Sequence, residues 1–305
     1  MNKPFLSGDG FAITAALIWG INYPLVKLVL QSISEDEFML IRFIASTTLL
    51  VSYLLISDEG IGISKNHYRR ILMLGLLGVG LYNILWTCGI HRTTSANAAL
   101  LISTSPIFTG IYAIAIKQEK VSRKTWTGTL LAFWGIYLII SNTPGTEFSL
   151  HSHVFVGNLL VLCGSLLFAL YAIIAKPLLE YYSPIKLTAM AMLCGLPIII
   201  LYTIYQNPKF LLSTICYATW LKLLFIIVLG TIAAYVFWYK GVQQTSPVKT
   251  TIYHYVVPIT SMFLGALFLE EPINLSQLLG ALFVFLGLII AKTDLITRLK
   301  RAIYC

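Results

Sequence analysis

Apolar segments long enough to cross a lipid bilayer follow one another along almost the whole chain. A membrane-spanning helix needs about 20 mostly apolar residues, because it rises about 1.5 Å per residue through a hydrocarbon core of about 30 Å. The sequence therefore predicts an all-α integral membrane protein with ten transmembrane helices. They lie at Phe11–Leu30, Phe38–Ile56, Ile71–Ile90, Ala96–Ile116, Thr125–Ile140, Val154–Ala175, Ile185–Tyr205, Trp220–Tyr239, Val248–Leu269 and Leu275–Ala291.

Composition excludes the soluble classes. Of the 305 residues, 58% are hydrophobic and 11% are charged, against roughly 45–50% and 25% in soluble domains. The short connections leave no room for a soluble catalytic domain. The five cysteines are scattered without metal-ligand spacing, so the sequence predicts no metal site and no cofactor.

Positive charge gathers on every second connection. The net charge of +9 is therefore interpreted as a topology signal rather than as a nucleic-acid surface, because cytoplasmic loops of membrane proteins are enriched in Lys and Arg. The prediction is a multi-pass protein of the cell inner membrane with both termini cytoplasmic. The clusters are Lys65/Arg69/Arg70, Lys117/Lys120/Arg123/Lys124, Lys176/Lys186, Lys240/Lys249 and Lys292/Arg298/Lys300/Arg301.

The second half of the chain repeats the first. Because each unit has an odd number of helices, five, its second copy enters the membrane inverted relative to the first, as in many secondary transporters. We expect repeats at residues 1–143 and 153–293, followed by a basic cytoplasmic tail at 294–305. A shift of 152 pairs Gly78 with Gly230, Trp86 with Trp238, Pro106 with Pro258, Glu119 with Glu271 and Gly135 with Gly287, and a shift of 149 pairs Lys27 with Lys176 and Ser34 with Ser183.

These features together resemble a known family. Trp19-Gly20 in the first segment, Arg42 in the second, and the spacings Glu119…Gly128…Gly135 and Glu271…Gly280…Gly287 are similar to the EamA-type permeases of the drug/metabolite transporter superfamily. The resemblance implies export of amino acids or transport of other metabolites, through a cavity lined by segments one, three, four, six, eight and nine. The second copy departs from the pattern, with Phe168-Ala169 and Ala191 at the positions of Trp19-Gly20 and Arg42.

Matched prolines interrupt the fourth and ninth segments. Pro106 and Pro258 each remove one helical hydrogen bond and free the carbonyl four residues earlier, at Ile102 and His254. Paired interruptions in two inverted halves are typical of a transporter binding site or hinge. We therefore predict that both prolines act as hinges, with a packing kink as the alternative.

His254 is the one histidine well inside an apolar segment. Ionisable groups there usually face the bundle interior or a water-filled cavity. We predict that His254 contacts the substrate and is the candidate for proton coupling. The alternative is a neutral imidazole hydrogen-bonded to a neighbouring helix.

Further aromatic and amide residues within the segments complete the predicted site, since rings can stack on flat substrate parts while amides supply hydrogen bonds. Trp86 and Trp238, near opposite ends of their segments, fit membership of the interfacial aromatic belts slightly better than a place in the site. The predicted substrate contacts besides His254 are Trp19, Asn22, Tyr82, Trp86, Asn97, Tyr171 and Trp238.

Lys27 and Arg42 lie toward the external ends of the first two segments, beside the acidic run 35–37. The favoured interpretation is that both cations reach the interface and pair with these acids. The functional alternative makes them a gate or a docking point for a carboxylate or phosphate.

The sequence thus predicts a non-enzymatic secondary transporter of small organic solutes that works by alternating access around a midplane cavity. The family resemblance favours export of amino acids or related metabolites. Alternatives are a facilitator or exchanger of nucleotide-type metabolites such as S-adenosyl compounds, and a sensor or intramembrane enzyme. No clustered nucleophile and base support an enzyme. The expected partners are the lipid bilayer and a small-molecule substrate, and the sequence leaves proton coupling and a homodimer open.

Overall fold

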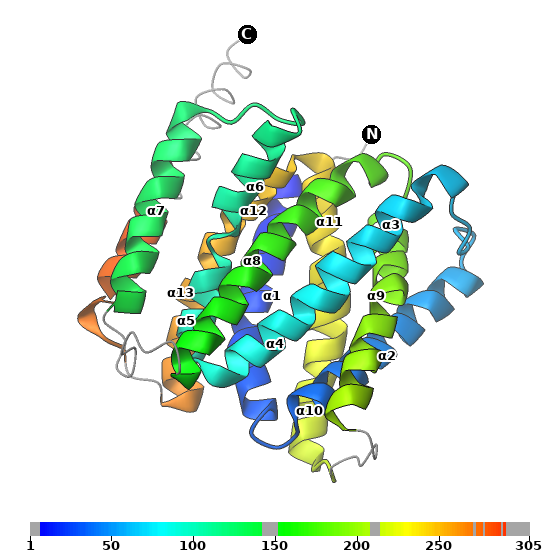
Figure 1. Cartoon of the computed structure of the whole chain (residues 1–305), viewed down its shortest axis with the longest axis horizontal. Coiled ribbons are helices and arrows are strands. Elements are labelled where there is room, and N and C mark those ends of the chain that lie inside the picture. The colour runs from blue at the N-terminus through cyan, green and yellow to red at the C-terminus, as the bar shows by residue number, and fades with distance from the viewer. Residues whose placement is uncertain are drawn as a thin grey trace.

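The computed structural model describes residues 7–141, 152–207, 214–270, 273–276, 278–287 and 289–290, and it has no strand among them. The helices of the first half are α1 Gly8–Val29, α2 Glu35–Ile56, η1 Lys65–His67, α3 Tyr68–Gly75, η2 Leu76–Leu81, α4 Tyr82–Arg92, α5 Ser95–Ile102, α6 Ser105–Ala115 and α7 Arg123–Ser141. Those of the second half are α8 His153–Leu178, α9 Pro184–Gln206, α10 Tyr217–Phe225, η3 Ile226–Ala233, α11 Ala234–Gln244, α12 Pro247–Thr251, η4 Ile252–Tyr255 and α13 Val256–Leu269. Figure 1 shows them as one bundle of long helices.

Eight helical stretches in the described residues are long and apolar enough to cross a membrane. They coincide with the first four predicted segments and with the sixth to ninth. At the fifth predicted segment lies α7, and at the tenth a shorter apolar helix, Leu278–Gly287. The all-helical membrane class is therefore confirmed, whereas a count of ten spans stays a prediction, and the tail 294–305 lies outside the described residues.

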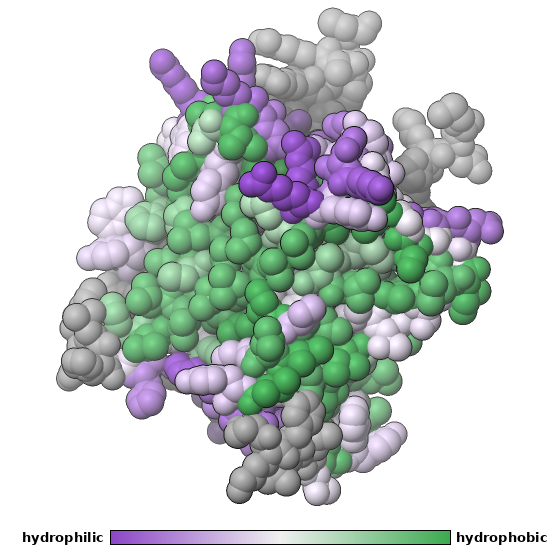
Figure 2. Space-filling model, turned by 45° about the vertical axis from the view of Figure 1, so that its right-hand side comes forward, coloured by the Kyte–Doolittle hydropathy of each residue, from purple (hydrophilic) through white to green (hydrophobic). Residues whose placement is uncertain are grey.

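The surface carries the pattern that a bilayer demands. Large apolar side chains such as Leu49, Leu201 and Leu224 are exposed. In Figure 2 apolar residues form a broad band across the visible face, with hydrophilic residues above and below it. An apolar band of this kind would be unstable in water and is stable against lipid.

Corresponding helices of the two halves each pack against the opposite half. Helix α1 packs on α11 and α13, and its counterpart α8 packs on α4 and α6. The counterparts α2 and α9 also pack on each other, and they run antiparallel. Thr203 near the end of α9 donates to the Asp36 carbonyl at the start of α2 (3.4 Å), while Lys186 near the start of α9 donates to the Glu59 carbonyl just beyond α2 (2.8 Å). The second copy is therefore inverted relative to the first.

Matched serines begin the counterpart helices α2 and α9. Ser34 and Ser183 are their N-caps, each accepting a hydrogen bond from the backbone N–H three residues on. Such a side chain satisfies one of the N–H groups that a helix start leaves without a partner. The sequence pair at a shift of 149 thus marks the same structural position in both copies.

Each half also contains one wide, π-helical segment inside a long helix. These are η2, between α3 and α4, and η3, between α10 and α11. A π-helical segment rotates the side chains that follow it relative to a continuous α-helix, and such segments are frequent at functional sites. Here they directly precede Tyr82, Asn83 and Trp86 in one half and Tyr235 in the other, which line the cavity described below.

The fourth and ninth predicted segments are broken at matched positions. The first break separates α5 from α6 at Ser103 and Thr104, and the second is the short 3₁₀ segment η4 between α12 and α13. The two carbonyls expected to be free have side-chain partners: Ser165 donates to the Ile102 carbonyl (3.2 Å) and Ser103 donates to the His254 carbonyl (3.0 Å). Irregular backbone inside a membrane needs such partners, because no water is available there.

Candidate functional site

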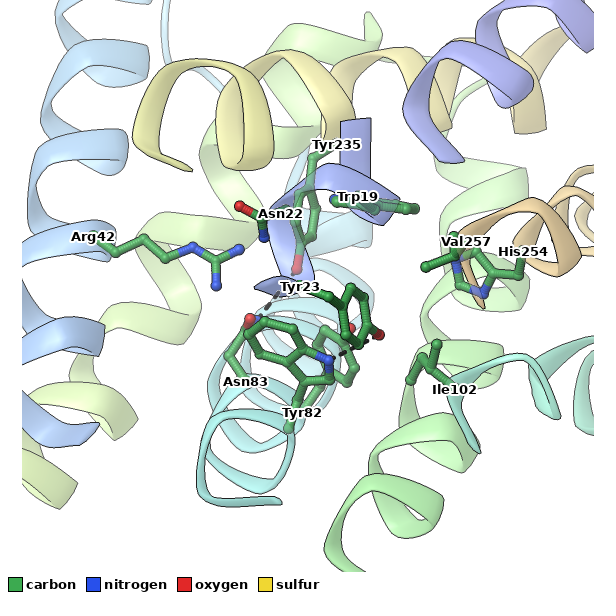
Figure 3. Close-up of a pocket in the computed structure, with 11 residues that line it drawn as sticks. Trp19, Asn22, Tyr23, Arg42, Tyr82, Asn83, Ile102, Tyr235, His254 and Val257 are labelled. Carbon is green, nitrogen blue, oxygen red and sulfur yellow. Dashed lines mark hydrogen bonds between the residues drawn. The ribbon is translucent and has the colours of Figure 1, made fainter. Parts of the chain in front are cut away.

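A small cavity lies between the two halves, bounded by η4, by α1, α2, α4, α5, α11 and by the start of α13. Its volume is about 20 Å³, space for roughly one water molecule. Figure 3 shows Arg42 entering from one side and His254 from the other, with aromatic side chains between them. The lining residues are Trp19, Asn22, Tyr23, Arg42, Tyr82, Asn83, Trp86, Ile102, Tyr235, His254 and Val257.

The segments that follow the π-helical turns meet across the cavity. Asn83, just after η2, donates to the hydroxyl of Tyr235, just after η3 (3.3 Å). The two residues are counterparts at the shift of 152. Asn83 also donates to the Val79 carbonyl (2.8 Å), and Trp86 donates to the Tyr23 hydroxyl (2.9 Å). A hydrogen-bonded aromatic layer therefore joins the two copies at the cavity.

Gly230 lets the first helix approach η3 closely. The Trp19 indole donates to the Gly230 carbonyl (3.1 Å), and a Cβ added at Gly230 would lie 2.4 Å from the Asn22 side-chain oxygen. The counterpart glycine behaves alike: a Cβ at Gly78 would lie 2.2 Å from the ring of Tyr171. Only glycine leaves room for these contacts, which explains this matched pair in the sequence.

His254 lies in an aromatic sandwich. Its ring stacks on Phe168 (centroids 4.5 Å apart, 29° between planes) and on Trp238 (4.5 Å, 24°), and it meets Trp19 edge-on. Its Nδ1 is hydrogen-bonded to the Ser105 hydroxyl across the break between α5 and α6 (2.8 Å). His254 therefore has features of both predicted roles: it lines the cavity, as a substrate contact would, and its imidazole is hydrogen-bonded to a neighbouring helix.

Arg42 faces the cavity rather than the acidic loop, so the favoured sequence interpretation is wrong for it. The side chain is 2% exposed. Its Nε donates to the Thr231 hydroxyl (2.6 Å), which itself donates to the Ile226 carbonyl (2.8 Å). The guanidinium lies 5.0 Å from the ring centre of Phe43. Among the described residues no carboxylate lies within ion-pair distance of Arg42, and its Nη1 has no hydrogen-bond partner.

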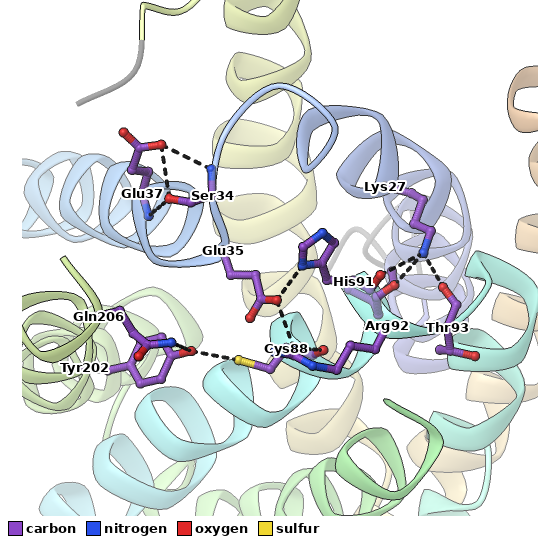
Figure 4. Close-up of polar contacts among 11 residues, drawn as sticks. Lys27, Ser34, Glu35, Glu37, Cys88, His91, Arg92, Thr93, Tyr202 and Gln206 are labelled. Carbon is purple, nitrogen blue, oxygen red and sulfur yellow. Dashed lines mark hydrogen bonds and ion pairs between the residues drawn. The ribbon is translucent and has the colours of Figure 1, made fainter. Parts of the chain in front are cut away.

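The acidic loop has other partners. Glu35 forms ion pairs with Arg92 (2.8 Å) and with His91, and Glu37 closes a capping box with Ser34. Figure 4 shows these contacts close together, at the start of α2 and the end of α4. Arg92 lies outside the five positive clusters named above, and this pairing gives it a local role.

Lys27 holds a helix end. Its ammonium donates to the carbonyls of Ile90 (2.9 Å), His91 (3.2 Å) and Thr93, at the C-terminus of α4 (Figure 4). These carbonyls have no partner within the helix, and a cation there also meets the negative end of the helix dipole.

Lys176, the counterpart of Lys27, makes the matching contacts at the other end of the bundle. It donates to the carbonyls of Val242 (3.0 Å), Gln243 (3.0 Å) and Thr245 (3.3 Å), at the C-terminus of α11. A Cβ at Gly8, the start of α1, would meet the Gln244 side chain at 2.7 Å, whereas Lys27 is in the last turn of α1. The two lysines therefore fasten opposite ends of the bundle.

Five of the eight predicted substrate contacts line the cavity, and three do not. Trp19, Asn22, Tyr82, Trp86 and His254 line it, and Arg42 joins them. Trp238 lies behind the lining, stacked on His254, and Tyr171 stacks on Tyr239 (4.9 Å, 17°). Asn97 is hydrogen-bonded near the start of α5, to Thr93 and Thr94.

Trp86 and Trp238 do not belong to the aromatic belts. They are 3% and 0% exposed, so neither indole is available for contact with lipid headgroups. The lining residues that the predicted set omitted are Tyr23, Asn83, Ile102, Tyr235 and Val257. Asn83 and Tyr235 are counterparts at the shift of 152, and this correspondence is the sequence signal from which both could have been predicted as lining residues.

The sequence model of the EamA-like transporter family matches residues 6–141 and again residues 155–293. The chain belongs to this family. The two matches together cover most of the chain, and they agree with the duplication in its sequence. The resemblance to EamA-type permeases is thereby confirmed.

Several curated relatives of this EamA-like protein are named as transporters. It is 24% identical over 282 residues to "Uncharacterized transporter YyaM" of Bacillus subtilis (strain 168), covering 91% of this chain and 90% of that protein. It is 25% identical over 285 residues to "Uncharacterized transporter YetK" of the same organism, covering 93% and 86%. "Protein PecM" of Dickeya dadantii (strain 3937) is 23% identical over 298 residues, covering 95% and 94%. Family and relatives indicate a multi-pass membrane transporter.

The fold has a solved counterpart. A crystal structure titled "Crystal structure of protein" superposes with a TM-score of 0.74 at 14% identity, covering 96% of this chain and 98% of that one. At this identity the likeness concerns the fold alone.

Proposed function

We propose that this EamA-like protein is a secondary transporter of the inner membrane that exports small organic solutes, such as amino acids or related metabolites, by alternating access. The observation that carries the proposal is the central cavity, lined by residues of both inverted copies and flanked by a broken helix from each. In transporters built from inverted repeats, the substrate site lies near the midplane between the repeats, at interrupted helices.

The closed cavity fits an occluded step of such a cycle. A space of about 20 Å³ holds no organic solute, so the lining must separate before a solute enters. Lys27 and α4 hold one end of the bundle together. Lys176 and α11 hold the other, where the Tyr253 hydroxyl also donates to Asp9 (2.6 Å). Release of one end at a time, with bending at the Pro106 and Pro258 breaks, would open the cavity alternately to the two sides.

The test is transport by the purified protein in liposomes. A thermal-shift screen first identifies solutes that stabilise the folded protein, with amino acids, nucleosides, nucleotides and S-adenosyl compounds as the classes. Each hit is then tested for counterflow against protein-free liposomes. We expect at least one class to bind and to exchange. Hits among the S-adenosyl compounds alone would favour a nucleotide-type carrier, and binding without any exchange would contradict the transport function.

A further inference from the structure

Arg42 is a buried cation without a counter-ion in the described part of the chain. A charged side chain inside a membrane protein is costly unless it is paired. Arg42 is 2% exposed, its Nε is held by Thr231, and its Nη1 is buried without a partner. The guanidinium is therefore fixed at one edge and unsatisfied at the edge that faces the cavity (Figure 3).

We propose that Arg42 is the carboxylate subsite of this transporter and that its solutes are organic monocarboxylates. This inference rests on the proposed transport function. A guanidinium presents its N–H groups in a planar fork that matches a carboxylate, and charge-assisted hydrogen bonds of this kind are among the strongest in proteins. A carboxylate at Nη1 would satisfy the buried donor and neutralise the buried charge together.

The remaining lining selects against other ionic groups. Arg42 is the one Lys or Arg among the lining residues, and the lining contains no Asp or Glu. One positive charge balances a monoanion, whereas a phosphate dianion would keep a surplus negative charge in a low-dielectric site. An ammonium group would find no lining acid to pair it, so a zwitterionic amino acid would have to place its ammonium on the aromatic faces of the lining, away from Arg42.

The rest of the lining suits the body of such a solute. The side opposite Arg42 carries His254, Val257 and Ile102, which offer aromatic and aliphatic contact (Figure 3). Asn22 lines the same cavity. Its side-chain amide can hydrogen-bond a hydroxyl next to the carboxylate, so α-hydroxy acids fit this lining.

The experiment compares matched solutes on the full-length purified protein. Lactate and mandelate supply the carboxylate with a hydroxyl, propionate and phenylacetate supply the carboxylate alone, and lactamide and mandelamide remove the charge with little change of shape. Thermal shift and isothermal titration are measured for the wild type, Arg42→Gln, Arg42→Lys and the exposed control Arg69→Gln. We expect the wild type and Arg69→Gln to bind the carboxylates and not the amides.

In Arg42→Gln we expect carboxylate affinity about tenfold or more weaker, with an unliganded melting temperature equal to or above that of the wild type, because an unpaired buried charge is removed. If Arg42→Gln does not fold, Arg42→Lys provides the test. Lysine keeps the positive charge but lacks the planar set of guanidinium N–H groups, so we expect Arg42→Lys to bind carboxylates more weakly than the wild type.

Carboxylate binding that survives both substitutions would overturn the inference, as would equal binding of acids and amides by the wild type, or a wild type that binds none of the six solutes. Transport of an uncharged or cationic solute, unchanged in the Arg42 variants, would overturn the Arg42 subsite while leaving the transport function standing.

Discussion

His254 holds the two halves together with three kinds of contact. Its ring is stacked on both sides, its Nδ1 is bonded to Ser105, and its carbonyl accepts from Ser103. Removing the ring would leave a hole in a close-packed core, which costs stability apart from any effect on a ligand. Substitution by alanine therefore mixes a structural loss with a functional one.

A substitution that keeps the ring separates the two effects. We expect His254→Phe to retain the stacking on Phe168 and Trp238, and so to melt clearly above His254→Ala, although loss of the hydrogen bond to Ser105 lowers its melting temperature below that of the wild type. It should lose transport by about tenfold or more, because the polar edge at the cavity is gone. Thermal melting and liposome counterflow measure the two effects, with His254→Ala for comparison. Wild-type transport by His254→Phe would mean that His254 packs and does not contact the solute.

The site was predictable where chemistry alone marked a residue. His254, Trp19 and Asn22 are unusual side chains in apolar segments, and the structure places them at the cavity. Tyr171 and Trp238 are equally unusual, yet they lie one layer behind. A π-helical segment precedes Trp238 in its long helix, and it changes which face looks inward. The sequence periodicity of an α-helix cannot reveal that rotation.

At the scale of helices, the two broken segments are the places where we expect the helices to bend during transport. Both breaks use a serine from elsewhere to satisfy the freed carbonyl. A backbone group bonded to a side chain rather than to its own helix can exchange partners when helices shift, while a continuous helix must bend as one rod. The matched prolines keep the helices from closing over these breaks.

We predict that Pro106→Ala and Pro258→Ala slow transport without weakening solute binding. Alanine restores the missing N–H and favours a continuous helix, which stiffens the segment at the break. Titration should give unchanged affinity, and counterflow should be several-fold slower in either variant. Pro197→Ala, within α9, is the control and should transport like the wild type. Fast transport in both variants would exclude these prolines as hinges.

The counterpart lysines should act at opposite ends. Lys27→Met removes three hydrogen bonds to the end of α4, and Lys176→Met removes three to the end of α11. We expect each variant to favour opening of its own end. Single cysteines placed at each cavity mouth, labelled by a membrane-impermeant maleimide in oriented vesicles, should become more accessible on opposite sides. The exposed Lys65→Met is the control, and equal labelling patterns would refute the assignment.

At the scale of the molecule, duplication determines more of the structure than any single motif. Paired glycines, serines and lysines at shifts of 149 and 152 predicted the inverted copies, and the structure places Ser34 and Ser183, and likewise Lys27 and Lys176, in equivalent contacts. The direction of the Arg42 side chain, toward the cavity, could not be predicted from the repeat. The counterpart of Arg42 is Ala191, so the repeat offered no second example, and the direction depends on how α2 packs between η3 and α9.

If Arg42 is the carboxylate subsite, its charge, which has no counter-ion in the described part of the chain, would make the transport cycle sensitive to voltage. A monocarboxylate seated on Arg42 would make the loaded site neutral, so the loaded protein would cross its conformational change without moving net charge. The empty protein would return with Arg42 uncompensated. Over a full cycle without a coupled ion, the net charge moved is that of the solute, and each elementary charge is worth about 2.3 kcal/mol per 100 mV.

We therefore expect net efflux of a monocarboxylate to depend on voltage, while exchange of the same solute on both sides does not. Valinomycin and potassium gradients set the potential of the liposomes, and labelled solute reports both modes. An inside-negative potential should accelerate net efflux. Exchange that responds to voltage as strongly as efflux would contradict a neutral loaded site. In a cell whose interior is negative, the resting potential alone would then expel the solute, and export would need no partner ion.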